Sequence, residues 1–261
     1  MSPQYLIISI LLLFNSFLFA DGKLDKIYKN NELKVCIWTQ YYGISYLDNR
    51  TQKLIGIDSD LAKELAQELG VKLKYIQSSF PSLVEDINSN KCDIAMFAIG
   101  NTKDRRKKIR FTSAHLSSDI YAITTKTNQK IKNWNDIDKK GIIVGVAKGT
   151  YHYKVMEDKL KNAKLLISKS FKHRSQDLQS GRSDVFMTDY PYAKRMLAKT
   201  NWAKLITPLK TYHKTPYAWA LSYGNEKFFN RVEKFIKDIK NDGRLKMYAK
   251  KNGLLPIVKL D

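Results

Sequence analysis

The chain has 261 residues, of which 43% are hydrophobic and 11% aromatic. This is enough for one or two globular domains with buried cores and too apolar for a disordered chain. Lysine and arginine number 46 against 25 aspartate and glutamate, a net charge of +21. The basic residues are scattered and form no basic helix with interleaved aromatic residues. The charge therefore predicts a solvated basic surface rather than nucleic-acid binding.

The N-terminus carries an almost unbroken apolar run over residues 6–19, followed by Ala20. The run is shorter than the roughly 20 residues of a membrane-spanning helix. A small residue at its end is typical of signal-peptidase cleavage, here after Ala20. We therefore predict a signal peptide over residues 1–20 and a soluble periplasmic protein. An uncleaved anchor is the alternative, because residues 1–5 contain no Lys or Arg.

In the first part of the chain, short apolar runs typical of strands alternate with segments whose apolar residues recur at helical spacing. Strands are predicted at residues 33–38, 71–76 and 92–99, and helices at residues 57–69 and 82–88. The first helix repeats apolar residues at helical spacing and ends at Gly70. This alternation predicts βαβ units and a parallel, doubly wound α/β sheet.

The alternation then restarts at residue 120. Strands are predicted at residues 120–125, 141–147, 163–167, 184–189 and 217–223, and helices at residues 135–137, 149–160, 176–180, 192–199 and 226–241. Two α/β lobes fit this length better than one large sheet. We predict lobe 1 from residues 21–116 and 217–261, and lobe 2 from residues 117–216. Two crossings, near residues 117–121 and 214–217, would form a hinge.

Cys36 and Cys92 both fall in predicted strands of lobe 1. An oxidising compartment permits a disulfide between them, and two buried thiols that pack as small hydrophobes are the alternative. Neither cysteine has metal-site spacing, and the histidines show no paired metal spacing. We therefore expect no metal and no cofactor.

Two buried strands end in residues suited to bind charge. A basic stretch that includes Arg105 follows the strand at 92–99, and a second strand ends at Asp189. Ligands of doubly wound sheets bind outside the carboxyl ends of strands, where an arginine fork matches a carboxylate. A carboxylate at position 189 would suit an ammonium. The alternatives are a solvated helix face for the basic stretch and a helix N-cap for Asp189.

Spaced motifs in the chain together resemble the periplasmic solute-binding proteins of amino-acid ABC transporters, the family that binds polar amino acids. They are LIGIDSDLAKELA at 54–66, TKDR at 102–105 with FT at 111–112, GVAKGT at 145–150, and SGRSD at 180–184 leading to Asp189. The resemblance implies the type II periplasmic binding protein fold with two lobes. It also implies capture of an amino acid between the lobes and delivery to a membrane permease by a monomer.

The resemblance further assigns roles to individual residues. Arg105 would clamp the ligand α-carboxylate, and Asp189 would bind the α-ammonium from the opposite lobe. The other expected ligand-binding residues are Ala98 through its carbonyl, Gly100 through its N–H, Thr150 and Tyr151 at a helix start, Trp38, Tyr41 and Phe80 around the side chain, and His152 as a polar contact. Gly100 departs from the Ser or Thr of many relatives. A box of Trp38, Tyr41, Tyr42 and Phe80 favours a flat apolar ligand side chain. Cation–π attraction to a charged tip and ordinary core packing are the alternatives.

Two other functions stay open at this point. The same fold family contains exported cyclohexadienyl (prephenate/arogenate) dehydratases, which need a general acid soon after the position of Asp189. Here Tyr190, Pro191 and Tyr192 follow instead, so we expect no enzyme. A ligand-sensing module for a membrane receptor is the other alternative. Of the histidines, His152 is expected in the cleft, and His115, His173 and His213 at the surface.

Overall fold

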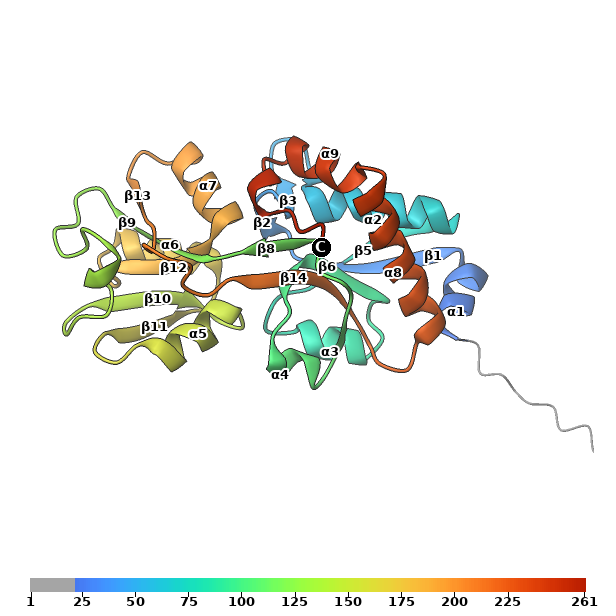
Figure 1. Cartoon of the computed structure of the whole chain (residues 1–261), viewed down its shortest axis with the longest axis horizontal. Helices are drawn as coiled ribbons and strands as arrows, with labels where there is room; N and C mark the ends of the chain where they lie inside the picture. The colour runs from blue at the N-terminus through green and yellow to red at the C-terminus, as the bar shows by residue number, and fades with distance from the viewer. Residues whose placement is uncertain (1–21) are drawn as a thin grey trace, which may run out of the picture.

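The computed structural model describes residues 22–261, so the predicted signal peptide lies outside the described residues. Two lobes lie side by side, each built on a sheet covered by helices (Figure 1). The predicted two-lobed α/β fold is confirmed. Among residues 22–261, no helix is long and apolar enough to cross a membrane.

Lobe 1 is built on a six-stranded sheet of order β5-β1-β6-β14-β7, with β8 paired to β14. Its strands are β1 (Glu32–Ile37), β5 (Lys72–Gln77), β6 (Ile94–Gly100), β7 (Arg110–Phe111), β8 (Leu116–Ser118) and β14 (Thr215–Leu221). A smaller sheet contains β2 (Gln40–Tyr41), β3 (Ser45–Asp48) and β4 (Lys53–Ile55). The helices are α1 (Lys23–Asn30), α2 (Ile57–Leu69), α3 (Leu83–Asn88), α4 (Lys103–Arg106), α8 (Glu226–Asn241), α9 (Arg244–Lys251) and the 3-10 helix η2 (Leu255–Ile257).

Lobe 2 is built on a five-stranded sheet of order β11-β10-β12-β9-β13. Its strands are β9 (Ile120–Thr125), β10 (Ile143–Ala147), β11 (Lys164–Ser168), β12 (Val185–Asp189) and β13 (Ala203–Ile206). The helices are the 3-10 helix η1 (Trp134–Asp136), α5 (Tyr151–Lys159), α6 (Phe171–Gln179) and α7 (Tyr190–Lys199). All residues of β12 are buried, as are all residues of β6 in lobe 1. Such strands read as continuous apolar runs because both faces of the sheet are covered.

The prediction of purely parallel sheets is wrong where the chain passes between the lobes. β14 pairs antiparallel with β6, and β9 pairs antiparallel with β12. The chain leaves lobe 1 through β8 and returns through β14, and these strands run side by side between the lobes (Figure 1). A strand that arrives from the other lobe, such as β9 or β14, runs opposite to the neighbouring strand of the sheet that it joins. The residue bounds of the two lobes stay a prediction.

Cys36 and Cys92 form a disulfide in lobe 1, which decides between the two alternatives left open by the sequence. Cys36 lies in β1, and Cys92 lies just before β6. The bond therefore ties two neighbouring strands of the sheet at a sequence separation of 56 residues.

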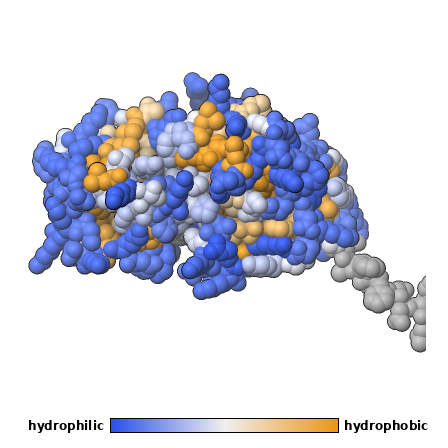
Figure 2. Space-filling model, in the orientation of Figure 1, coloured by the Kyte–Doolittle hydropathy of each residue, from blue (hydrophilic) through white to orange (hydrophobic). Residues whose placement is uncertain are grey.

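On the face shown in Figure 2, both lobes are mostly hydrophilic, with smaller apolar areas between. Many of its lysines and arginines pair with carboxylates on the same or a neighbouring element, such as Lys154 with Glu157 at 2.9 Å and Arg231 with Glu68 at 2.9 Å. Exposed pairs of this kind contribute little stability, and the excess positive charge lies in solvent.

Candidate ligand-binding site

Arg105 lies at the interface between the lobes and contacts both of them. Its Nη1 donates to the Gly100 carbonyl of lobe 1 and its Nη2 to the Gly149 carbonyl of lobe 2, both at 2.9 Å. The side chain is positioned by α4, whose N-cap Thr102 accepts a hydrogen bond from the Arg105 backbone N–H. Burial lowers the pKa of Arg105 to about 10, and nearby tyrosines, Tyr151 first, oppose this. The guanidinium stays charged at neutral pH.

Asp189 is the acidic counterpart at the same interface. It is the N-cap of α7 and accepts from the Tyr192 backbone N–H at 3.4 Å, as the N-cap alternative predicted. Its other oxygen, Oδ2, accepts from the hydroxyls of Tyr217, at 2.7 Å, and of Tyr41 in lobe 1. Burial raises the pKa of Asp189, although these donors oppose the rise. Asp189 therefore caps a helix and presents a carboxylate oxygen to lobe 1.

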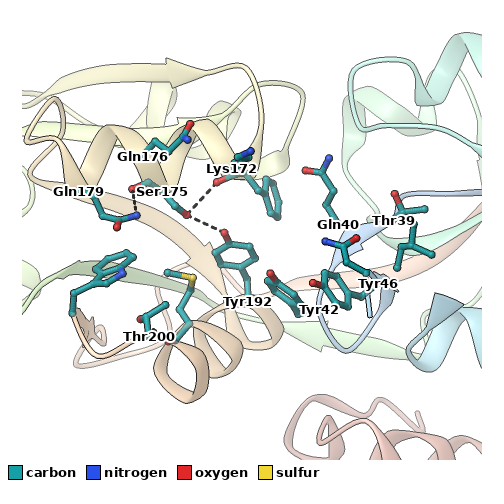
Figure 3. A pocket seen from close by; sticks show the side chains of 15 residues that line it. Thr39, Gln40, Tyr42, Tyr46, Lys172, Ser175, Gln176, Gln179, Tyr192 and Thr200 are labelled. Atoms are coloured by element: carbon teal, nitrogen blue, oxygen red, sulfur yellow. Dashed lines mark hydrogen bonds between the residues drawn. The ribbon is translucent and has the colours of Figure 1, made fainter. Parts of the chain in front are cut away.

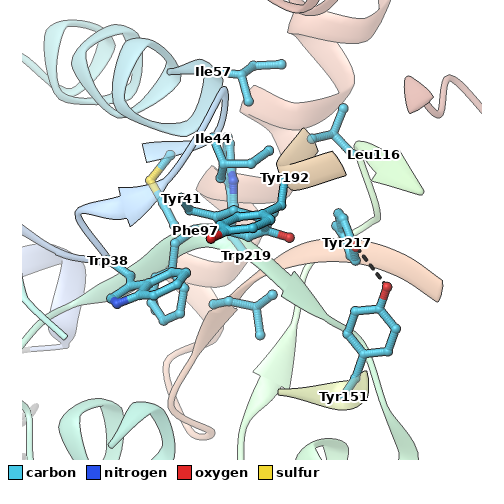
Figure 4. Close-up of a cluster of buried hydrophobic side chains, with 14 of the residues drawn as sticks. Trp38, Tyr41, Ile44, Ile57, Phe97, Leu116, Tyr151, Tyr192, Tyr217 and Trp219 are labelled. Carbon is cyan, nitrogen blue, oxygen red and sulfur yellow. Dashed lines mark hydrogen bonds between the residues drawn. The ribbon is translucent and has the colours of Figure 1, made fainter. Parts of the chain in front are cut away.

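A chain of hydroxyl groups continues from Asp189 along the interface. The Tyr217 hydroxyl also lies 3.0 Å from the Tyr151 hydroxyl at the start of α5 (Figure 4). Burial, followed by the negative charge of Asp189, holds the pKa of both tyrosines well above the ordinary value. The phenols therefore stay protonated and act as hydrogen-bond donors.

Three of the four predicted aromatic residues form one cluster in lobe 1, which we call the aromatic cage: Trp38, Tyr41 and Phe80. The ring of Trp38 lies 5.6 Å from that of Tyr41 and 5.2 Å from that of Phe80. A fourth ring, Phe171 of lobe 2, packs into this cage, 4.4 Å from Trp38 and 5.9 Å from Tyr41. The sequence prediction missed Phe171 because it began the helix at residue 176. Ser170, whose side chain accepts from the His173 backbone N–H, is the N-cap signal that marks the true start.

Ala98 is held in a conformation that non-glycine residues rarely adopt, with a φ of 47°. Its backbone N–H donates to Asp58 at 2.6 Å. Asp58 also accepts from the Trp219 indole at 2.9 Å and lies 3.0 Å from the ring of His115. Asp58 and His115 are both fully buried, so the expectation that His115 lies at the surface is wrong. His115 packs against Trp219 inside lobe 1, and the apolar spacing alone gave no sign of this.

Thr150, Tyr151 and His152 form the start of α5 in lobe 2, where Thr150 is the N-cap. The turn before them needs Gly149, whose φ is 77° and whose Cβ would lie 2.7 Å from the Pro81 nitrogen of lobe 1. This close approach lets the two lobes touch. His152 is buried against the Tyr151 ring, and burial lowers its pKa well below the ordinary value. The predicted site residues are thus brought to one interface, although their roles toward a ligand stay predictions.

An open cavity of about 580 Å³ lies at the mouth of the interface (Figure 3). Lobe 1 contributes Thr39, Gln40, Tyr42 and Tyr46, and α6 of lobe 2 contributes Lys172, Ser175, Gln176 and Gln179. Of the residues predicted around the ligand, only Tyr42 lines it. Arg105, Asp189 and the aromatic cage lie deeper, where the lobes are in contact.

Known proteins are similar to this chain in sequence and in fold. The L-cystine-binding protein TcyJ of Escherichia coli K12 is 27% identical over 235 residues, 89% of this chain and 87% of that protein. Cyclohexadienyl dehydratase of Pseudomonas aeruginosa is 29% identical over 172 residues, 65% of this chain and 63% of the enzyme. The crystal structure of the ancestral amino acid-binding protein AncCDT-1, a precursor of cyclohexadienyl dehydratase, superposes with a TM-score of 0.80 at 28% identity. It covers 88% of this chain and 99% of that chain.

A model of one family matches most of the chain, residues 33–254. The matched range contains the strands of both lobes, except the first residue of β1, and every residue of the candidate site. The chain therefore belongs to the bacterial extracellular solute-binding proteins, family 3.

Proposed function

We propose that this solute-binding protein captures an α-amino acid between its lobes, as a zwitterion, and delivers it to an ABC permease. The observation that carries the proposal is the placement of Arg105 and Asp189. One cation and one anion, borne by different lobes, face a single buried interface, where each now bonds to groups of the protein. An α-carboxylate and an α-ammonium would replace those internal partners.

The contacts support a mechanism of ligand-biased closure. Arg105 would hold the carboxylate through two parallel hydrogen bonds, assisted by the backbone around Gly100 and Thr150. Asp189 and the Ala98 carbonyl would hold the ammonium. Because these groups come from both lobes, a bound zwitterion favours the form in which the lobes are together. Strands β8 and β14, which run between the lobes, would act as the hinge.

We further infer that the protein works outside the cytoplasm, as a monomer, after loss of residues 1–20. The family is described as extracellular, and an oxidising compartment suits the disulfide between Cys36 and Cys92. One chain carries both halves of the site, so no second copy is needed to complete it. Mass spectrometry of the exported protein tests the cleavage after Ala20, and light scattering tests the monomer.

Calorimetric titration with the twenty amino acids and L-cystine tests the function. We expect tight binding of one or a few, abolished by Arg105→Ala. The matched control is Arg106→Ala, because Arg106 is exposed and bonds only to Asn101 through its guanidinium. Binding that Arg105→Ala leaves intact, or no amino acid bound by the wild type, would contradict the proposal.

The dehydratase relative makes an enzyme the second candidate. We propose that the protein does not catalyse this reaction, because Tyr190, Pro191 and Tyr192 follow Asp189 where an acid is expected. Asp189 itself is already bonded to three donors: the Tyr41 and Tyr217 hydroxyls and the Tyr192 N–H. Turnover of prephenate or arogenate by the purified protein would establish the enzyme instead.

A further inference from the structure

Arg174 in α6 is a buried guanidinium that the proposed function does not use. The residue is 0% exposed, and its Nη1 donates to the Met187 carbonyl at 2.8 Å. Within residues 22–261, its Nε and Nη2 have no hydrogen-bond acceptor. A buried cation with unused donors is costly, since it has given up water without a full set of replacements.

The two unused donors lie on the same edge of the guanidinium. Nε–H and the Nη2 group point in parallel, and this pair of donors matches the two oxygens of one carboxylate. The edge therefore has the geometry of a bidentate carboxylate site. Nη1, on the other side of the guanidinium, donates to the Met187 carbonyl of β12.

Aromatic rings rather than carboxylates surround this cation. The guanidinium carbon lies 4.3 Å from the rings of Phe171 and Phe186 and 4.7 Å from that of Tyr192. Burial lowers the pKa of Arg174, which Tyr192 and Asp189 partly oppose. The Tyr192 hydroxyl bonds to Ser175 at 3.0 Å; it also interacts with the guanidinium, but without the geometry of a full hydrogen bond to Nε or Nη2. Asp189 bonds to other groups, so neither residue completes the guanidinium.

Two neighbours of Arg174 also carry unused polar atoms. Both ring nitrogens of His152 and the Thr188 hydroxyl are buried without partners among the described residues. The charge of Arg174 is one of the causes that lower the pKa of His152, and a contact of the ring with the Thr188 backbone opposes this. These side chains thus share one region of lobe 2 near the end of β12, next to Asp189. Unused donors from three elements in one place indicate a site built for an acceptor.

Phe171 separates Arg174 from the aromatic cage. Its ring lies 4.3 Å from the guanidinium carbon and 4.4 Å from the ring of Trp38. It is the first residue of α6 and borders the open cavity, so its ring would turn toward that cavity. The space that the ring leaves would then connect the aromatic cage with the edge of Arg174 that carries Nε and Nη2.

We propose that Arg174 binds a second carboxylate, at the far end of the ligand side chain, which takes the place of the Phe171 ring. This inference rests on the proposed function and narrows the ligand to amino acids with two carboxylates. L-glutamate is a short member of this class and L-cystine a long one. The α-carboxylate and α-ammonium are held by Arg105 and Asp189, and the side chain crosses the cage.

The test compares ligands that differ only at the far end. Calorimetry measures L-glutamate against L-glutamine and L-norleucine, and L-cystine against S-methylthio-L-cysteine, which lacks the second carboxylate. We expect the wild type to bind a dicarboxylic ligand at least tenfold more tightly than its partner. Arg174→Gln should reduce that preference to less than threefold. Lys172→Gln is the matched control, since Lys172 is an exposed cation on the same helix.

Each outcome decides a different question. If the wild type prefers the neutral partner, or Arg174→Gln keeps the preference for the second carboxylate, this inference is wrong. The proposed function then stands, provided that Arg105→Ala abolishes binding. If no amino acid binds, both fall together. If Arg174→Gln does not fold, as judged by circular dichroism, the wild-type comparison alone decides because it needs no variant.

Discussion

The two lobes repeat one hydrogen-bonded unit around their central strands. In lobe 1, Asp93 accepts from the Lys34 backbone N–H at 2.8 Å, and in lobe 2, Asp184 accepts from the Ile143 N–H at 2.8 Å. Both aspartates come just before the buried strand at the centre of each sheet, β6 or β12. The three strands involved have the same order, β5-β1-β6 and β11-β10-β12.

A second element of the unit is repeated as closely. Ser78 donates to Asp86 at 2.6 Å in lobe 1, and Ser168 donates to Asp177 at 2.6 Å in lobe 2. Each aspartate also pairs with a cation that follows its helix, Lys91 at 2.8 Å and Arg182 at 2.6 Å. The two lobes therefore share a scaffold, and their differences at matching positions indicate where function has changed them.

The first difference lies five residues beyond the two strand-start aspartates. Lobe 1 has Ala98 there, which offers a backbone carbonyl, whereas lobe 2 has Asp189, which offers a carboxylate. The second difference lies within the scaffold. Where lobe 1 has the bonded pair Cys36 and Cys92, lobe 2 has Gly145 and Ser183 at the matching register. A Cβ on Gly145 would lie 3.3 Å from the Ser183 hydroxyl.

Replacement of both cysteines by serine should have the largest effect on stability, and it should be confined to lobe 1. A cross-link that closes a loop of this length contributes up to about 4 kcal/mol by restricting the unfolded chain. We expect urea unfolding to split into two transitions, with lobe 1 unfolding first. A single transition at the wild-type midpoint would show that the disulfide does not distinguish the lobes.

Asp189→Asn should weaken binding of the proposed amino acid about 100-fold, which corresponds to about 2.7 kcal/mol. The amide keeps the shape of the carboxylate but loses the charge that holds the ammonium. Ala98→Gly, at the matching position, keeps the carbonyl and should change affinity less than threefold. Equal losses of affinity for the two variants would show that the two positions do not differ in function.

Gly145→Cys combined with Ser183→Cys should form a disulfide in lobe 2 and raise its free energy of unfolding by about 2 kcal/mol. This is less than the loop length alone predicts, because an engineered bond distorts the native geometry. Thiol titration checks that the bond forms, and urea unfolding measures the gain. Free thiols under oxidising conditions would mean that the two scaffolds differ more than their registers indicate.

The affinity for the amino acid should fall with acid, by about tenfold per pH unit below the pKa of Asp189. Burial raises that pKa above the ordinary 3.8, so the loss begins at a higher pH than for an exposed carboxyl. The sign for the unliganded protein is opposite, since a raised folded-state pKa makes stability increase as Asp189 protonates. Titrations at several pH values, with Asp189→Asn as the insensitive control, check both directions.

Asp86→Asn and Asp177→Asn should have the smallest effects, a loss of about 1 kcal/mol each. Each removes the ion pair and weakens the serine hydrogen bond at an equivalent position, and Asp86 also accepts from the Ser82 hydroxyl at 2.8 Å. Thermal unfolding of the two variants compares them directly. A loss several times larger in one lobe would show that the repeated units do not carry equal stability.

The sequence predicts the central scaffold well for a physical reason. Strands such as β6 and β12 are continuous apolar runs, and α2 and α8 repeat their apolar residues at helical spacing. Elements with weak patterns were missed. α1 buries only Ile27 among its residues, and the strands of the smaller sheet are two to four residues long.

The candidate site divides in the same way. Arg105 and Asp189 could be predicted because each follows a buried strand within a recognisable motif. The partners that they have in this structure, Tyr217 and the Gly149 carbonyl, depend on how the lobes meet, which local pattern does not contain. Arg174 was missed for a similar reason, because nothing in its sequence surroundings indicates a cation that is fully enclosed by aromatic rings.

The fluorescence of Trp38 should report whether the two lobes are together or apart. This residue is only 6% exposed while its ring touches Phe171 of the opposite lobe, so separation of the lobes would bring water to the indole and shift its emission to the red. Trp219, in the core of lobe 1, stays shielded in either form and supplies an internal reference. Trp134 and Trp202 are partly exposed and add a background, so the emission change on each candidate ligand, measured against Trp38→Phe, would follow closure without a label.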